Sequence, residues 1–595
     1  MVTPNIWGQG QLFAFSALDG GSFAGEDFVG TLSGDKIGIR FHTKVIRELA
    51  VIKVADLEPV FETVASDLIR LRTNMGSVTV IYADTHTIIG AVAGHAEVAV
   101  MVEGCHTIRK TGALELHDTC DGEFTALLRD GDRFAFAYGK TEEAAIRKAQ
   151  RGILLDIETS IQKKLAVFQK HSLDTAHPYA ALYAKCVSVM KSQLYSPEGR
   201  FQRIWSTPDR LPHKKLWLWD SVFHAIGHRN LDPRLAEDLI LAVLDCQAED
   251  GFIPHMAAIR NSSSIIQPPV IAWGAWLVYE KSRSREFLKT VWEANKRFLL
   301  WCRRCRRETD EELYTWLTDS NVNCRCDESG MDNSPRFDVH TRLQAIDFSC
   351  FMANDLRFMA KIASELEDPE GEARFTHWYK QIREDINRKL WCGKDRFYYD
   401  YDLPKGCLHN VSSVASFLPL FAGICTPEQA KYLVQHLQDP ETFGTPYPIP
   451  SISKKDPTYG SDMWRGPVWI NYNYMILLGL REYGYGVLAD EIRDKTLRLL
   501  HQWYLKKGTV YEFYDSENQC APNELNRKGS VFEPYDFTVR YQAIRDFGWS
   551  CTLGLDMLQS TITSDSGPRR CCLPQTLRCP RFSGGRCQPG TGSCR

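Results

Sequence analysis

The chain has 595 residues, a net charge of −3 and 44% hydrophobic residues, a composition typical of a globular protein long enough for two or more domains. So balanced a charge excludes an electrostatic footprint for nucleic acid or for an anionic membrane surface. No run approaches the roughly 20 apolar residues that a membrane-spanning helix requires.

Residues 1–140 are predicted to form an antiparallel β-sandwich. The segments 28–32, 78–82 and 98–102 are short and rich in β-branched residues, and Gly, Asp or Asn turn signals recur between them. The N-terminus lacks the basic start and apolar stretch of a secretory signal, so we predict a cytoplasmic protein.

From Thr141 the pattern becomes helical. Residues 142–170 predict one long helical stretch, because their apolar positions follow a period close to 3.6, and residues 141–174 are expected to link two domains. Further helices are predicted at 235–246, 271–279, 287–301, 342–364, 375–391, 430–437, 468–483 and 489–504. Loops rich in Gly, Pro, Trp and Asp separate them. This alternation over 175–560 suggests a toroid of helical hairpins with the site on one rim. The sequence lacks the fixed-period repeat that would indicate an open solenoid.

The tail, residues 561–595, differs in character from the rest of the chain. It is rich in Arg, Cys, Gly and Pro and has no periodicity, which favours disorder. A shifted reading frame or mispredicted exon would also explain the change, as would, less readily, a small metal or disulfide knot.

The 19 cysteines follow no disulfide framework, and reduced thiols are the expectation in a cytoplasmic protein. Cys302, Cys305, Cys324 and Cys326 superficially resemble a four-thiolate zinc site, but one residue instead of two separates the second pair. We predict no metal and no cofactor, although whether these four cysteines bind anything stays open.

Two carboxylates, Asp332 and Glu512, each lie in a polar-aromatic loop, and tryptophan-containing segments occur at 217–220, 464–469 and 547–549. A glycosidase needs such a pair, because one group protonates the leaving oxygen while the other activates water or attacks the sugar. Aromatic faces meanwhile bind the apolar face of a pyranose. Taken singly, Asp332 could cap a helix and Glu512 could belong to a surface turn.

Seven segments, in order along the chain, resemble the signature loops of glycoside hydrolase family 63. They are residues 217–227, 251–255, 267–269, 328–338, 464–471, 511–515 and 547–553. Within that family the chain looks most like mannosylglycerate and glucosylglycerate hydrolases, over roughly residues 175–558. The resemblance implies an (α/α)6 barrel that hydrolyses α-linked glucosides or mannosides with inversion, without a metal in the chemical step.

Carried over by position, the resemblance makes Asp332 the general acid and Glu512 the general base. We expect Glu328 or nearby aromatic rings to keep Asp332 protonated, and the hydroxyls of Tyr511 and Tyr514 to orient Glu512. The two carboxyl groups are expected about 6.5–9.5 Å apart, the separation that admits a water molecule.

The resemblance also implies substrate-binding residues. Asp220 matches a carboxylate that binds sugar hydroxyls, and its position also fits a helix N-cap. Arg465 is a candidate for a substrate carboxylate, and His224 and His255 could orient site carboxylates. The other candidates, for which core packing is the alternative, are Trp219, Gln267, Trp464, Trp469 and Tyr511.

Several interpretations stay open. The substrate is expected to be a small saccharide or glycosyl-glycerate, but glucose and mannose are not distinguished, and oligomeric state is not indicated. Another six-hairpin glycosidase (trehalase, glucoamylase or debranching enzyme) is one alternative, and a non-enzymatic glycan-binding protein is another. The segment 517–535 is longer and more charged than expected and is predicted to reshape the leaving-group side.

Overall fold

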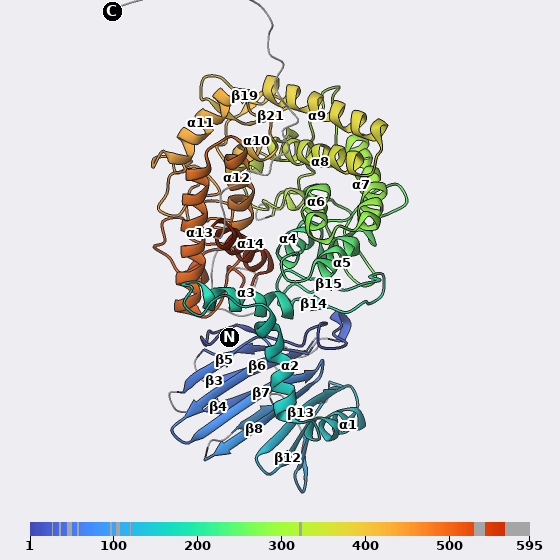
Figure 1. Ribbon diagram of the computed structural model, residues 1–595, viewed down its shortest axis with the longest axis vertical. Helices are drawn as coiled ribbons and strands as arrows, with labels where there is room; N and C mark the ends of the chain where they lie inside the picture. Colours follow the sequence, from blue (N-terminus) through green and yellow to red (C-terminus); the bar gives the residue numbers. More distant parts are fainter. Residues whose placement is uncertain are drawn as a thin grey trace, which may run out of the picture.

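The computed structural model describes residues 1–26, 28–34, 37–43, 50–55, 59–95, 98–102, 107–119, 121–320, 324–528 and 542–565. A β-sheet part and a helical barrel lie one above the other in Figure 1, with the N-terminus near their junction. Residues 566–595, most of the predicted tail, lie outside the described ranges. No helix within these ranges is long and apolar enough to cross a membrane.

Two antiparallel sheets form the N-terminal part. One has the strand order β1-β2-β3-β4-β9 and the other β10-β11-β12-β13-β8-β7-β6-β5. Their facing sides bury one aromatic cluster, in which Phe28 stacks on Phe41 and on Tyr138 at centroid distances of 5.1 and 5.3 Å. The strands are β1 (Leu12–Phe13), β2 (Phe28–Leu32), β3 (Ile37–Thr43), β4 (Ala50–Ala55), β5 (Val60–Val64), β6 (Leu68–Thr73), β7 (Gly76–Asp84), β8 (Thr87–Gly94), β9 (Ala99–Val102), β10 (Thr107–Thr111), β11 (Leu114–Asp118), β12 (Phe124–Asp130) and β13 (Arg133–Gly139).

The helical stretch predicted over 142–170 is two helices, α1 (Glu142–Ile153) and α2 (Ile157–Lys170). The predicted stretch is helical but interrupted, because Asp156 adopts an extended conformation and its side chain accepts a hydrogen bond from Thr159 N at 2.8 Å, which starts the second helix. Helix α1 packs on β12 and β13, whereas α2 runs from the sheets toward the barrel (Figure 1).

Twelve helices of the described chain form the barrel, which has the (α/α)6 architecture. Six of them make a closed inner ring in which α4, α6, α8, α10, α12 and α14 each contact the next and α14 contacts α4 again. The inner helices are α4 (Leu218–His228), α6 (Ile271–Ser282), α8 (Ile346–Glu365), α10 (Leu418–Phe421), α12 (Ile470–Glu482) and α14 (Gly548–Asp565); the others are α3 (Ala180–Ser192), α5 (Pro233–Leu244), α7 (Arg285–Cys305), α9 (Pro369–Lys389), α11 (Pro427–Gln438) and α13 (Gly486–Lys507).

Short elements connect the barrel helices. These are β14 (Leu194–Tyr195), β15 (Trp205–Ser206), β16 (Leu216–Trp217), β17 (Met256–Ala257), β18 (Leu343–Gln344), β19 (Trp391–Cys392), β20 (Phe397–Tyr398), β21 (Asp400–Asp402) and β22 (Cys407–His409), with the 3-10 turns η1 (Ala24–Glu26), η2 (Asp327–Ser329), η3 (Pro335–Phe337), η4 (Val414–Phe417) and η5 (Pro522–Glu524). The helices α3, α4 and α14 were not among those predicted from periodicity. Most of the residues of α3 and α4, and residues 548–558 of α14, are buried.

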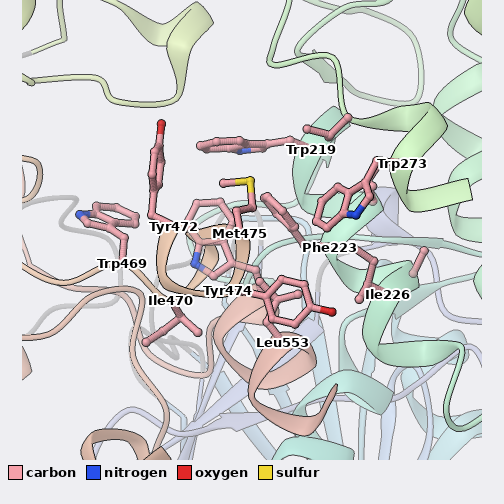
Figure 2. Packing of buried hydrophobic residues seen from close by; sticks show 14 of the residues in the cluster. Trp219, Phe223, Ile226, Trp273, Trp469, Ile470, Tyr472, Tyr474, Met475 and Leu553 are labelled. Atoms are coloured by element: carbon pink, nitrogen blue, oxygen red, sulfur yellow. The ribbon is translucent and has the colours of Figure 1, made fainter. Parts of the chain in front are cut away.

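The interior of the ring is filled by large side chains from the inner helices. Figure 2 shows Trp219 and Phe223 of α4 close to Met475 of α12, with Trp273 of α6 beside them. Phe223 also contacts Trp273 edge to face at 6.2 Å.

Four of the six outer helices start differently from the inner helices, whereas the outer helices α3 and α13 also lack a side-chain cap. The outer helices α5, α7, α9 and α11 each begin with an N-cap side chain that accepts a backbone hydrogen bond: Asp232, Ser284, Asp368 and Thr426. The inner helices α4, α6, α8 and α12 have no such cap. Distant side chains bond to some of their first N–H groups instead. Asp355 accepts from Ala272 and Trp273 of α6, for example.

A buried network of two acids and two lysines joins the sheets to the barrel. Lys191 of α3 contacts Asp67 at 2.7 Å and Asp19 at 2.9 Å, and Lys164 of α2 contacts the same two carboxylates. The N-terminal segment also reaches a barrel loop, because Leu12 N donates to Asp546 Oδ2 at 2.6 Å. The sheets are therefore tied to the barrel by charge as well as by packing.

Candidate active site

One pocket opens at the rim where the inner helices begin, and it holds about 420 Å³ of empty space. Its walls come from the loops that precede α4, α6, α8, α12 and α14, so residues far apart in sequence meet there. The described residues lining it are Pro208, His213, Trp217, Trp219, Asp220, Gln267, Gly330, Asp332, Met463, Trp469, Glu512, Arg527, Phe547 and Trp549.

Asp332 lies between the turns η2 and η3, in a loop that is anchored by buried ion pairs. Four residues after it, the fully buried Arg336 pairs with Asp347 at 2.6 Å and with Asp400 at 2.8 Å. The Asp332 side chain is 16% exposed, and its Oδ2 accepts from Lys528 Nζ at 2.6 Å. Burial disfavours the Lys528 ammonium, but the charge of Asp332 outweighs it and raises the pKa of Lys528.

Glu512 lies between α13 and α14 and is only 3% exposed. Arg527 donates to it twice, from Nε to Oε2 at 2.8 Å and from Nη2 to Oε1 at 3.2 Å, and Ile544 N lies 3.4 Å from Oε2. Burial opposes the charged guanidinium, yet Glu512 outweighs it and raises the pKa of Arg527. Two consecutive cations therefore contact these two carboxylates: Arg527 contacts Glu512, and Lys528 contacts Asp332.

Asp220, a third carboxyl group of the pocket, is the third residue of α4 and lies just inside its first turn. Burial raises the pKa of Asp220 well above its usual value, and nearby carboxylates, Glu512 and Asp332 among them, raise it further. The N-cap of α4 is Trp217, so the predicted capping role of Asp220 was wrong. Gln267 accepts from Trp219 N through Oε1 at 3.1 Å and so fixes the start of this helix.

Indole rings form the apolar part of the pocket. Trp219 meets Trp549 edge to face at 5.3 Å, and Trp549 lies 5.7 Å from Trp469. Trp464 stacks on Trp469 with centroids 3.8 Å apart and planes 2° from parallel. The pocket thus combines flat apolar walls with three carboxyl groups, which suits a sugar ring.

The comparisons with known proteins agree with this geometry. A family model described as the mannosylglycerate hydrolase MGH1-like glycoside hydrolase domain matches residues 213–550, more than half of the chain. The chain belongs to this family. It is an inverting glycoside hydrolase, as the resemblance to family 63 predicted.

Curated relatives and solved structures give the same picture. The chain is 27% identical over 376 residues to the mannosylglycerate hydrolase of Thermus thermophilus. This match covers 50% of this chain and 88% of the relative. It is 25% identical over 404 residues to the mannosylglycerate hydrolase of Rubrobacter radiotolerans, with 52% and 86% covered. A crystal structure of the GH63 mannosylglycerate hydrolase from Thermus thermophilus in complex with glucose has a TM-score of 0.52 at 24% identity, covering 63% of this chain and 99% of that chain. These neighbours confirm the predicted fold.

For this family member, the structure brings six of the predicted site residues into one pocket: Trp219, Asp220, Gln267, Asp332, Trp469 and Glu512. Trp464, Arg465 and Tyr511 are not among its described lining residues. Trp464 lies behind Trp469. Arg465 donates to Asn333 O and pairs with Asp338 at 2.5 Å, so its guanidinium is already bound by a carboxylate of the protein.

The groups expected to tune the two carboxylates differ from those observed. Glu328 pairs with Arg306 at 2.7 Å and accepts from two backbone N–H groups. Its charge is therefore balanced by Arg306 and does not act on Asp332 alone. The Tyr514 hydroxyl accepts from Tyr511 N at 2.7 Å and is thus engaged with backbone.

The two histidines make contacts of their own. His224 bonds to Ser206 Oγ at 2.8 Å, and burial lowers its pKa to about 3. His255 bonds to Ser263 Oγ at 2.6 Å. Burial lowers the pKa of His255 to about 4, although Asp332 acts in the opposite direction. Both side chains are therefore neutral near pH 7.

Sequence reasoning missed Arg527, Lys528 and His213. His213 Nδ1 lies 2.5 Å from Oδ2 of the buried Asp209, which orients the ring at the pocket wall. The available signals were weak: the unusual charge of the segment after Glu512, and a histidine four residues before the tryptophan pair. Neither signal shows which side chains Arg527, Lys528 or His213 would contact.

The cysteines do not assemble as a four-thiolate site. Within the described ranges, one group of donor atoms lies close enough for a metal, with all atoms within 4.8 Å, and it joins Cys324 to Asp327 and Asp332. The Lys528 ammonium already lies against this group, 2.9 Å from Cys324 Sγ. We assign no metal there, because the lysine supplies the positive charge.

Proposed function

We propose that this family member hydrolyses a small α-mannoside or α-glucoside, such as mannosylglycerate or glucosylglycerate. In this proposal Asp332 protonates the glycosidic oxygen, and Glu512 takes a proton from the water that attacks the anomeric carbon from the opposite side. The single observation that carries the proposal is that both carboxylates line one pocket with Trp219, Trp469 and Trp549.

The roles of the other residues follow from their places. The indole rings would bind the apolar face of the sugar, while Asp220 and Gln267 would bind its hydroxyls. Arg527 holds the Glu512 carboxylate in place, and a base that activates water must be oriented in this way. The separation of about 6.5–9.5 Å expected between Asp332 and Glu512 stays a prediction.

The thiols support a cytoplasmic location, which we also propose. Twelve cysteines lie in the described ranges, and all are free. Persisting free thiols are typical of a reducing compartment.

The proposal is tested by a hydrolysis screen of the purified full-length protein against mannosylglycerate, glucosylglycerate, kojibiose, nigerose, trehalose and maltose. Proton NMR of the first minutes of reaction identifies the anomer released. We expect hydrolysis of a glycosyl-glycerate with the β-anomer formed first. Preference for trehalose or maltose would favour another six-hairpin activity, and release of the α-anomer would overturn the assigned roles.

A further inference from the structure

Three side chains meet beside the proposed general acid, Asp332. Lys528 Nζ lies 2.6 Å from Asp332 Oδ2, 2.9 Å from Cys324 Sγ and 3.9 Å from Asp327 Oδ1, and Cys324 also contacts Asp327. Asp327 belongs to the turn η2, whereas Lys528 comes from the segment after Glu512, about 200 residues later. Asp332 thus has one positive and one negative neighbour.

This arrangement poses a chemical problem for an inverting hydrolase. The acid must carry a proton when the substrate binds, yet an ammonium at 2.6 Å favours its ionised form. A second carboxylate close by acts in the opposite sense, because two like charges in one site disfavour double ionisation. One carboxylate oxygen of Asp327 lies within 4.8 Å of one carboxylate oxygen of Asp332.

We propose that Asp327 and Lys528 are opposing positioning residues that together set the pH at which Asp332 loses its proton, an inference that rests on the proposed function. Asp327 favours the protonated acid and Lys528 the ionised one. The Asp327 side chain is 46% exposed.

The other titratable groups that face Asp332 are less able to play this part. They are Cys324, His255, Asp220 and Arg527. Burial raises the pKa of Cys324 and lowers that of His255 to about 4, so both are neutral near pH 7. Arg527 is bound to Glu512, and Asp220 is held within the packed start of α4. Partial burial, followed by the charge of Asp332, raises the pKa of Asp327 in spite of Lys528.

The experiment measures kcat/KM against pH for the glycoside identified in the screen, with Asp327→Asn, Lys528→Met and the double variant. Removing the negative neighbour should move the basic limb of the profile down by about one pH unit, and removing the positive neighbour should move it up by a similar amount. The double variant should return close to wild type. Lys528→Arg, which keeps the charge, should leave the limb within a few tenths of a unit.

Asp338→Asn is the matched control. Asp338 is an acid in the same loop as Asp332, but it pairs with Arg465 and not with Lys528. Its profile should keep the wild-type limb. A purely structural role for Asp327 and Lys528 would lower the rate at every pH without moving the limb, and that outcome would overturn the inference.

A second substrate separates this inference from the proposed function. An α-glycosyl fluoride needs no proton on its leaving group, so Asp332→Asn and the Asp327 and Lys528 variants should all hydrolyse it with no basic limb from the acid. If Asp332→Asn retains normal activity on the glycoside, the assignment of the acid itself fails. If Asp332→Asn is inactive on the glycoside but neither neighbour moves the limb, only the inference fails.

Discussion

Arg527 binds Glu512 through both of its donating edges, Nε and Nη2, at 2.8 and 3.2 Å, and both side chains are buried. Removing one member of a buried pair leaves an uncompensated charge. We therefore expect Arg527→Met to lower the free energy of unfolding by about 3 kcal/mol, measured by urea denaturation at pH 7.

A double-mutant cycle with Glu512→Gln tests this pairing. The double variant should lose less than the sum of the single losses. Arg357→Met is the matched control, because Arg357 makes an equally bidentate pair with Glu482 at 2.9 and 2.8 Å, but with side chains 22% and 40% exposed. Its loss should stay below about 1 kcal/mol. Strictly additive losses in the cycle would show that Arg527 and Glu512 are not coupled.

The two proposed catalytic carboxylates should each be essential for turnover. Asp332→Asn and Glu512→Gln remove a proton donor and a proton acceptor, which commonly costs about 10²- to 10⁴-fold in rate. Steady-state kinetics on the glycoside should show at least about a 100-fold fall in kcat for each variant. Circular dichroism should show an unchanged helical barrel. Near-normal kcat for either variant would refute its role.

Gly330 is expected to control the position of a pocket wall. Its φ is +70°, and a Cβ there would lie 2.3 Å from Cζ2 of Trp219. Gly330→Ala should displace the indole, and kcat/KM should fall by about 100-fold, as a misplacement near 1 Å can cause.

Gly406→Ala separates strain from contact in this prediction. Gly406 has φ +69°, but the nearest atom to its added Cβ is Tyr401 Oη at 3.8 Å. Both variants carry the left-handed backbone cost of about 1–2 kcal/mol, whereas only the first moves Trp219. Equal effects of the two on kcat/KM would mean that the indole contact is unimportant.

The buried acid Asp67 predicts a specific acid sensitivity. Burial alone would raise the pKa of Asp67, but Lys191 and Lys164 outweigh it and hold that pKa at about 2. Because this folded-state pKa lies below the unfolded-state value, the stabilisation is fully present above about pH 4 and is lost as pH falls toward 2. Asp67→Asn should cost about 2 kcal/mol at pH 7 and flatten the pH dependence between 4 and 2. Urea denaturation across that range would contradict this if the variant kept the wild-type slope.

The barrel could be predicted from sequence because its amphipathic outer helices keep a clear period of 3.6. Most of the site could also be predicted, since Trp219, Asp220, Asp332 and Glu512 lie in distinctive motifs at or before the start of an inner helix. The largely buried helices α4 and α14 were not predicted from periodicity.

What could not be predicted was the choice between neighbours. Glu328 and Asp327 are adjacent acids, and only the fold shows that Arg306 binds the first while the second lies near Asp332. Trp464 and Trp469 belong to one motif, yet the stack between them places only Trp469 at the pocket. Arg527 and Lys528 lie in an irregular segment whose partners are fixed by long-range contacts, for which local sequence carries no signal.

The bond from Leu12 N to Asp546 has a practical meaning for anyone who wishes to work with the barrel alone. Asp546 directly precedes Phe547, which lines the pocket, so the edge of the first sheet steadies a wall of the sugar site. A fragment starting near residue 175 would discard that support along with both acids bound to Lys191. A fusion tag on the N-terminus would likewise be attached close to the catalytic half, and a tag on the opposite end or none at all is the safer choice.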